Sequence, residues 1–182
     1  MQTPEVLSTN VLHRFRIFAI VEQALRLPSG RTVVRQLVKH PGAVVIIPQL
    51  EDGRLMLIAQ HRFAVGETLL EFPAGTLEPG EEPLQCARRE LIEETGYRAE
   101  HWRALGILYS SPGFCDERQH LFVASGLVPA HAAGDEDEIL EVKRLTVREV
   151  ERAIADGALV DAKSIAAYAR AKLQGVLAGM SA

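Results

Sequence analysis

The sequence predicts an α/β protein in which helices cover both sides of a mixed β-sheet. Residues 43–50, AVVIIPQL, form an almost continuous apolar strand, as is typical of a strand buried on both faces. A charged helical pattern follows Gly80 and ends at Gly96. Two more helices are expected near the end of the chain, at about 147–156 and 161–177. A helix on each side of the sheet gives an α/β/α sandwich.

The first forty residues are predicted to form an N-terminal antiparallel strand extension. Two strands are expected within residues 15–38, joined by a turn at Pro28-Ser29-Gly30. They contain too little apolar surface to form a core of their own. The predicted organisation is therefore an extension, 1–40, followed by the main domain, 41–182.

The main domain reads as a series of strands separated by turns and loops. Asp52-Gly53 predicts a hairpin turn into the strand at 54–62. Further strands are expected at 69–72, 104–111, 120–127 and 139–147. The last of these follows a polar loop, HAAGDEDE, at 131–138.

Composition excludes several classes of protein. The 182 residues are 47% hydrophobic and 24% charged, as in a soluble globular protein. The net charge is −4 and no Lys/Arg cluster is present, which disfavours a nucleic-acid partner. The longest apolar run, 43–47, is too short for a membrane, and the first residues lack a secretory pattern. Two cysteines, Cys86 and Cys115, make no disulfide framework, so we expect a cytoplasmic protein without a membrane partner.

The most informative segment, GTLEPGEEPLQCARRELIEETGY, covers residues 75–97. A helix is expected to begin at Pro83, because proline suits a first helical position, and to stop at Gly96. A stripe of residues on one side of this helix is predicted to pack on the sheet. It comprises Leu84, Ala87, Leu91 and Thr95.

Three carboxylates share an arc beside that stripe. Glu90, Glu93 and Glu94 lie at i, i+3 and i+4, and only Arg89 is near to offset them. Two such charges at ~6 Å repel by about 3 kcal/mol at an effective dielectric constant near 20. A hard divalent cation, Mg²⁺ or Mn²⁺, would remove this repulsion, and Mg²⁺ commonly bridges to phosphate. The pattern favours a metal site for a phosphorylated small molecule over an ordinary charged surface helix.

The spacing G-x5-E-x7-R-E-U-x-E-E-x-G-U, with U a bulky apolar residue, resembles the Nudix box. The resemblance implies the Nudix α/β/α sandwich and a role for each matching residue. Glu90, Glu94 and the backbone carbonyl of Ala74 match metal ligands. Glu93 matches a third carboxylate that supports a further metal ion or a catalytic water. Arg89 and Glu81 match residues that orient the glutamates by ion pairing.

Segments outside the box resemble the ADP-ribose pyrophosphatases of that family. They span 27–44, 59–75, 110–117 and 134–142. The resemblance implies substrate contacts from five residues, whose alternatives are exposed strand charges or a simple turn. They are Arg62, Arg35, Pro112, Gly113 and Glu117. Four phenylalanines are candidates to stack on adenine, although packing in the core is favoured for each. They are Phe15, Phe18, Phe63 and Phe114.

The acidic run 135–138 is the second chemical signal. The resemblance implies that Glu136 is the general base and that Glu138 is a metal ligand; the reverse assignment and a solvated turn both stay open. A base outside the helix that contains the matched metal ligands is reasonable, because a carboxylate bound to Mg²⁺ has too low a pKa to accept a proton well.

Together these features predict Mg²⁺-dependent hydrolysis of ADP-ribose to AMP and ribose 5-phosphate. One alternative is a hydrolase of other nucleoside-diphosphate sugars, such as ADP-glucose or GDP-mannose, or of dinucleotides. Another is a module that senses ADP-ribose without cutting it. The resemblance also implies a homodimer in which the extension completes a partner's pocket.

Overall fold

The computed structural model describes residues 2–130 and 140–177. The chain forms two compact units. The first contains the chain up to Gly42 together with Tyr109–Arg118, and the second contains Ala43–Leu108 and the chain from Gln119 onward. The first unit thus includes the predicted extension and a later segment that the sequence did not associate with it.

The first unit is built on a three-stranded antiparallel sheet, ordered β1-β2-β3. Its strands are β1 (Glu5–Arg14), β2 (Ala19–Arg26) and β3 (Thr32–Lys39). The predicted turn between β2 and β3 is confirmed, and Gly30 adopts a φ of 82° there, which glycine tolerates best. Strand β1 was not predicted. All ten of its residues are exposed, so it lacks the alternation of buried and exposed positions that reveals a strand in a sequence.

The second unit contains two sheets. The four-stranded sheet has the order β7-β4-β9-β8, and the three-stranded sheet the order β10-β5-β6. Strand β4 pairs in parallel with β9 and antiparallel with β7, which confirms the mixed sheet. The strands are β4 (Ala43–Pro48), β5 (Leu55–Arg62), β6 (Glu67–Glu71), β7 (Ala74–Thr76), β8 (Tyr97–Tyr109), β9 (Arg118–Pro129) and β10 (Leu140–Leu145).

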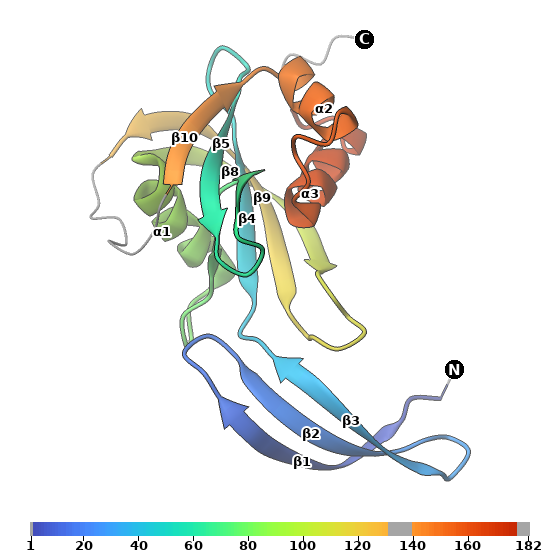
Figure 1. The fold of residues 1–182 in the computed structure, drawn as a ribbon. Helices are drawn as coiled ribbons and strands as arrows, with labels where there is room; N and C mark the ends of the chain where they lie inside the picture. The colour runs from blue at the N-terminus through green and yellow to red at the C-terminus, as the bar shows by residue number, and fades with distance from the viewer. Residues whose placement is uncertain (1, 131–139, 178–182) are drawn as a thin grey trace. The chain divides into compact units, whose positions relative to one another are not determined.

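Helices cover both faces of the four-stranded sheet (Figure 1). Helix α1 (Pro83–Thr95) lies on one face, and α2 (Val147–Ala155) and α3 (Ala162–Leu173) on the other. Strand β4 is buried throughout and alternates between the two layers. Val44 and Ile46 pack in the cluster that includes Leu91 of α1, whereas Val45 and Ile47 pack in the cluster that includes α2 and α3. The predicted α/β/α sandwich is confirmed.

The ends of α1 follow from its sequence. Pro83 occupies the first turn, where a missing N–H costs least. Gly96 ends the helix with a φ of 72°, and its N–H donates to the carbonyl of Ile92 at 2.8 Å. Cys86, Ala87 and Leu91 form the fully buried side of the helix. Burial raises the pKa of the Cys86 thiol to about 12, so this side chain stays a neutral thiol.

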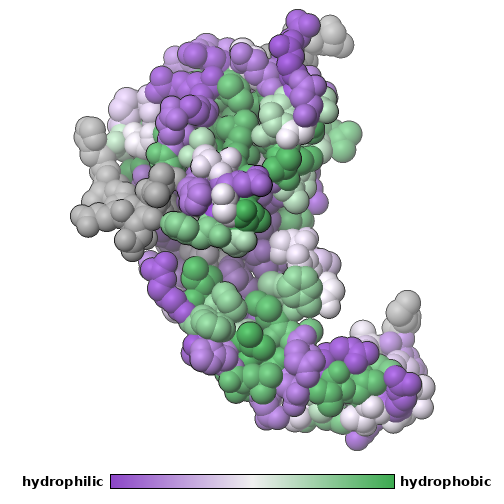
Figure 2. Space-filling model, in the orientation of Figure 1, coloured by the Kyte–Doolittle hydropathy of each residue, from purple (hydrophilic) through white to green (hydrophobic). Residues whose placement is uncertain are grey.

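The prediction that the four phenylalanines pack in the core is wrong. Phe63 is 77% exposed and Phe114 is 59% exposed, and Phe15 and Phe18 are exposed as well. Hydrophobic side chains are also visible on the surface of the first unit (Figure 2).

None of the helices in the described part of the chain combines the length and apolar character that crossing a bilayer requires.

Candidate active site

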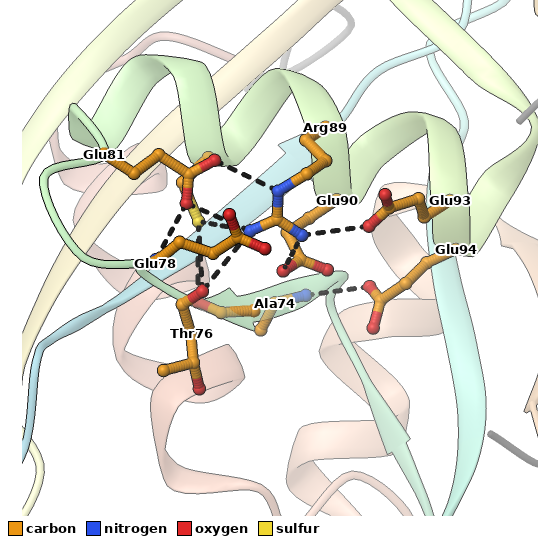
Figure 3. Close-up of polar contacts among 10 residues, drawn as sticks. Ala74, Thr76, Glu78, Glu81, Arg89, Glu90, Glu93 and Glu94 are labelled. Carbon is orange, nitrogen blue, oxygen red and sulfur yellow. Dashed lines mark hydrogen bonds and ion pairs between the residues drawn. The ribbon is translucent and has the colours of Figure 1, made fainter. Parts of the chain in front are cut away.

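The site begins with the way α1 is oriented on the sheet. Leu91 and Ala87 point into the core, which leaves Glu90 and Glu93 beside the buried face and Glu94 at its edge. Glu94 is only 3% exposed. The carboxylates of these glutamates are neighbours in space, as the helical period predicts (Figure 3).

Arg89 links most of the acidic groups of this site. Its Nη1 donates to Glu90 Oε1 at 2.7 Å and to Glu93 Oε2 at 2.9 Å. Its Nε and Nη2 donate to the two oxygens of Glu81 at 3.0 and 3.1 Å. These bonds lower the pKa of Glu81 and raise that of Arg89, so both groups stay charged near neutral pH. The structure thus contains the ion pairs expected of Arg89 and Glu81.

Strand β7 brings backbone to the same carboxylates. The N–H of Ala74 donates to Glu94 Oε2 at 2.9 Å. The Glu90 carboxylate lies against Gly75, where an added Cβ would be 1.9 Å from Glu90 Cδ. No residue other than glycine leaves room for this contact. Gly75, the first residue of the motif, therefore lets Glu90 of α1 approach the strand that contains Ala74.

A hard divalent cation fits the donor chemistry of this site. The glutamates of α1 offer carboxylate oxygens beside the backbone of β7, and oxygen ligands suit Mg²⁺ or Mn²⁺. No cluster of three His, Cys, Asp or Glu side chains with metal-ligand geometry occurs within residues 2–130 and 140–177. Mg²⁺ retains several waters, so a Mg²⁺ site needs fewer than three such side chains. The predicted base Glu136 and the predicted ligand Glu138 lie outside the described residues.

A buried ionic cluster lies close to α1. Arg62 donates through Nε and Nη2 to the two oxygens of Glu71, at 2.8 and 2.6 Å, and Lys163 also donates to Glu71. Burial raises the pKa of Glu71, but the bonds from Arg62 and the charge of Lys163 outweigh this effect and leave it below its usual value. The Glu94 carboxylate acts electrostatically on Arg62. Glu71 and Lys163 were not predicted, because their contact joins residues 92 positions apart.

The other predicted substrate residues belong to the first unit. Arg35 is exposed, and its Nη1 donates to the carbonyl of Val34. Glu117 Oε1 lies 3.9 Å from Nδ1 of His40. Gly113 is exposed in the loop next to Pro112. Pro112 lines a pocket of about 220 Å³ with several other residues of this unit. They are Leu37, Val38, Lys39, Tyr109, Phe114, Cys115 and Asp116. The substrate roles of these residues, and that of Arg62, stay predictions.

The fold and the carboxylate site define a nucleotide pyrophosphohydrolase that uses a divalent metal ion. Residues 39–168 match the NUDIX domain, and the chain belongs to the Nudix family. It is 38% identical to the ADP-ribose pyrophosphatase of Bacillus subtilis (strain 168), over 87% of this chain and 86% of that one. It is 37% identical to the methanol dehydrogenase activator of Bacillus methanolicus, over 95% of each chain. A crystal structure of an ADP compounds hydrolase superposes with a TM-score of 0.83 at 27% identity, over 96% of each chain.

Replacing either proposed glutamate ligand tests the metal site. Activity is expected to vanish in chelator and to return with Mg²⁺ or Mn²⁺. Glu90→Gln and Glu94→Gln are each expected to lower turnover at least ~10²-fold, because each removes ligand charge without changing volume. Glu82→Gln is the matched control, since Glu82 is an exposed carboxylate at the start of the same helix. Full turnover of either ligand variant at saturating substrate and metal would exclude that residue as a ligand.

Replacing Glu71 tests the buried cluster. Glu71→Gln leaves Arg62 and Lys163 without their buried counter-charge and is expected to lower the free energy of unfolding by about 2–4 kcal/mol at pH 7. The pKa of Glu71 is depressed in the folded state, so its stabilisation is complete above the unfolded pKa near 4.5 and is lost as the pH falls through the folded pKa. Urea unfolding of the wild type and of Glu71→Gln, at pH 7 and below pH 4, measures the loss of stability and its pH dependence. A wild-type advantage that is equal at the two pH values would contradict the assignment.

Proposed function

We propose that this chain hydrolyses the pyrophosphate of ADP-ribose to AMP and ribose 5-phosphate, with Mg²⁺ as its cofactor. The observation that supports it is the approach of the Nudix glutamates to the Ala74-Gly75 backbone, in a chain closely similar to an ADP-ribose pyrophosphatase. Bound Mg²⁺ would neutralise the pyrophosphate and lower the pKa of an attacking water. That water adds to one phosphorus, and the bond from that phosphorus to the bridging oxygen breaks.

The residues of α1 and β7 bind and organise the cation in this proposal. Glu90, Glu94 and the carbonyl of Ala74 are its ligands, and Glu93 supports a further metal ion or the water. Arg89 stays protonated through its bonds to Glu81 and offsets the repulsion among the glutamates. Its Nη1 also donates to both Glu90 and Glu93 and so holds the two carboxylates together. The carboxylates are therefore ordered before the cation binds.

The proton of the attacking water goes to Glu136 in this proposal, and Glu138 contributes a further ligand. A base on a separate loop keeps its pKa higher than that of a metal-bound carboxylate, which makes it a better proton acceptor. Arg62 binds a phosphate oxygen, and its pair with Glu71 holds the guanidinium plane in one orientation.

Selectivity for the rest of the substrate is assigned to residues of the first unit. They are Arg35, Pro112, Gly113 and Glu117. Hydrolysis of other nucleoside-diphosphate sugars or of dinucleotides would use the same metal chemistry. An ADP-ribose sensor without catalysis is disfavoured, because every glutamate of the box is retained. A cytoplasmic location belongs to the proposal and agrees with the free thiols of Cys86 and Cys115.

A homodimer is also part of the proposal. Seven large apolar side chains of the first unit are exposed between Val6 and Phe18. They are Val6, Leu7, Val11, Leu12, Phe15, Ile17 and Phe18. A surface of this kind is typical of an interface, and a second copy of the chain would cover it.

A substrate panel tests the proposed reaction. The catalytic efficiency on ADP-ribose is expected to exceed that on nucleoside triphosphates at least ~10-fold. It is also expected to exceed that on ADP-glucose and GDP-mannose. The reason is that polar groups of the pocket that bind a terminal ribose stay unpaired with other substrates. Product analysis is expected to give AMP and ribose 5-phosphate. Preferred cleavage of GDP-mannose would keep the chemistry and exclude the substrate. Preferred cleavage of a triphosphate would exclude the proposed roles of Pro112 and Glu117.

The two loop glutamates have distinguishable roles. Glu136→Gln is expected to lower turnover by about 10²–10⁴ with little change in substrate affinity, as for a positioned base. Glu138→Gln is expected to raise the metal concentration needed for half-maximal activity. Steady-state kinetics at several Mg²⁺ concentrations separates the two. Wild-type behaviour of Glu136→Gln together with an inactive Glu138→Gln would show that the assignments are reversed.

The assembly has a direct measurement. Light scattering of active enzyme at micromolar concentration is expected to give twice the mass of the 20.0 kDa chain. Phe15→Ser with Phe18→Ser is expected to weaken the dimer by removing apolar contact area. Phe63→Ser is the control, because Phe63 is an exposed phenylalanine of the second unit. An active enzyme with the mass of one chain would contradict the dimer.

A further inference from the structure

The segment that leads into β7 is hydrogen-bonded by two helices of the second unit, α1 and α3. From one side, Glu94 of α1 accepts the N–H of Ala74 at 2.9 Å. From the other side, the hydroxyl of Ser164 in the first turn of α3 accepts the N–H of Phe72 at 2.8 Å. Phe72 and Ser164 are both completely buried. Only Pro73 separates the two bonded residues, and proline has a restricted backbone and no N–H of its own.

The hydroxyl of Ser164 is oriented by a second bond. It donates to Oδ2 of Asp161 at 2.6 Å, which directs its hydrogen away from Phe72 and leaves a lone pair for the Phe72 N–H. Asp161 also caps α3 by accepting the N–H of Ser164 at 3.0 Å. Lys163 bridges Asp161 and Glu71, so the residue before Phe72 is bound by the same turn of α3.

Capping of α3 does not require this hydroxyl. The carboxylate of Asp161 and the backbone N–H of Ser164 make the cap, and alanine would fit the buried position. A buried hydroxyl costs free energy unless it is bonded, and its bonds to Asp161 and Phe72 are what distinguish serine from alanine here. Strand β6 ends at Glu71, and the Phe72 N–H therefore depends on Ser164 rather than on a sheet partner.

We propose that Ser164, oriented by Asp161, is a positioning residue of the metal site. It holds the backbone of Phe72 and Pro73 so that Ala74 stays at the distance from Glu94 that cation binding requires. The bond between Phe72 and Ser164 joins residues 92 positions apart. Together with the bond between Ala74 and Glu94, it couples the first turn of α3 to α1 through one backbone segment. This inference rests on the proposed role of Ala74 and Glu94 as metal ligands.

Mn²⁺ binding without substrate tests the proposal apart from catalysis. Electron paramagnetic resonance of free Mn²⁺, titrated with full-length protein, gives the affinity of the wild type and of each variant. Ser164→Ala is expected to weaken Mn²⁺ binding about 10-fold and to lower kcat on ADP-ribose by a similar factor, with KM changed less than about 2-fold. Ser164→Cys is expected to behave in the same way, because a thiol is a poor acceptor, and it replaces Ser164→Ala if that variant does not fold.

Tyr168→Phe is the matched control. Tyr168 is buried on the same helix, and its hydroxyl donates to Glu151 at 2.9 Å, away from the 71–74 segment. Tyr168→Phe is expected to lower the melting temperature while leaving Mn²⁺ affinity unchanged. Wild-type Mn²⁺ affinity in a Ser164 variant that is destabilised as much as Tyr168→Phe would overturn the proposal, as would a wild type that binds no Mn²⁺. A wild type that binds Mn²⁺ and leaves ADP-ribose intact would refute only the proposed substrate.

Discussion

Repulsion among the carboxylates of α1 is the constraint around which the second unit is built. Glu90, Glu93 and Glu94 lie next to one another on α1, beside or within its buried side, so none can move far away. Arg89 offsets this repulsion by bonding to Glu90, Glu93 and the more distant Glu81. The arginine cannot satisfy every charge of such a cluster, and a divalent cation completes the balance in the proposed enzyme.

The contacts of the β7 backbone depend on the same balance of charge among the carboxylates of α1. Glu90 lies so close to Gly75 that any side chain there would displace its carboxylate, and Glu94 accepts the N–H of Ala74. Each of these contacts aligns a carboxylate with a strand rather than with solvent. The cluster next to this strand is a second example, because the bonds from Arg62 and the charge of Lys163 keep the buried Glu71 carboxylate ionised. The short strand β7 and the charged helix α1 are therefore ordered together.

Local signals explain which parts of the fold the sequence revealed. Pro83 and Gly96 bracket α1, and the apolar run of β4 shows that it is covered on both faces. The ion pairs of Arg89 were also predicted, because their partners lie within one motif. Strand β1 was missed because exposure on both faces leaves no periodic pattern. The bond between Phe72 and Ser164 was missed because long-range contacts of single polar residues leave no local pattern.

Chemistry and proposed selectivity are divided between the two units of the chain. The proposed metal ligands Ala74, Glu90 and Glu94 belong to the second unit, whereas Arg35 and Glu117, which are proposed to contact the substrate, belong to the first. The proposed metal site lies in a closely spaced motif in which Arg89 bonds to Glu81, Glu90 and Glu93. The first unit is a sheet with many exposed side chains, and its residues can change without disturbing that motif. In the proposal, the group attached to the pyrophosphate can therefore change while the metal chemistry is retained.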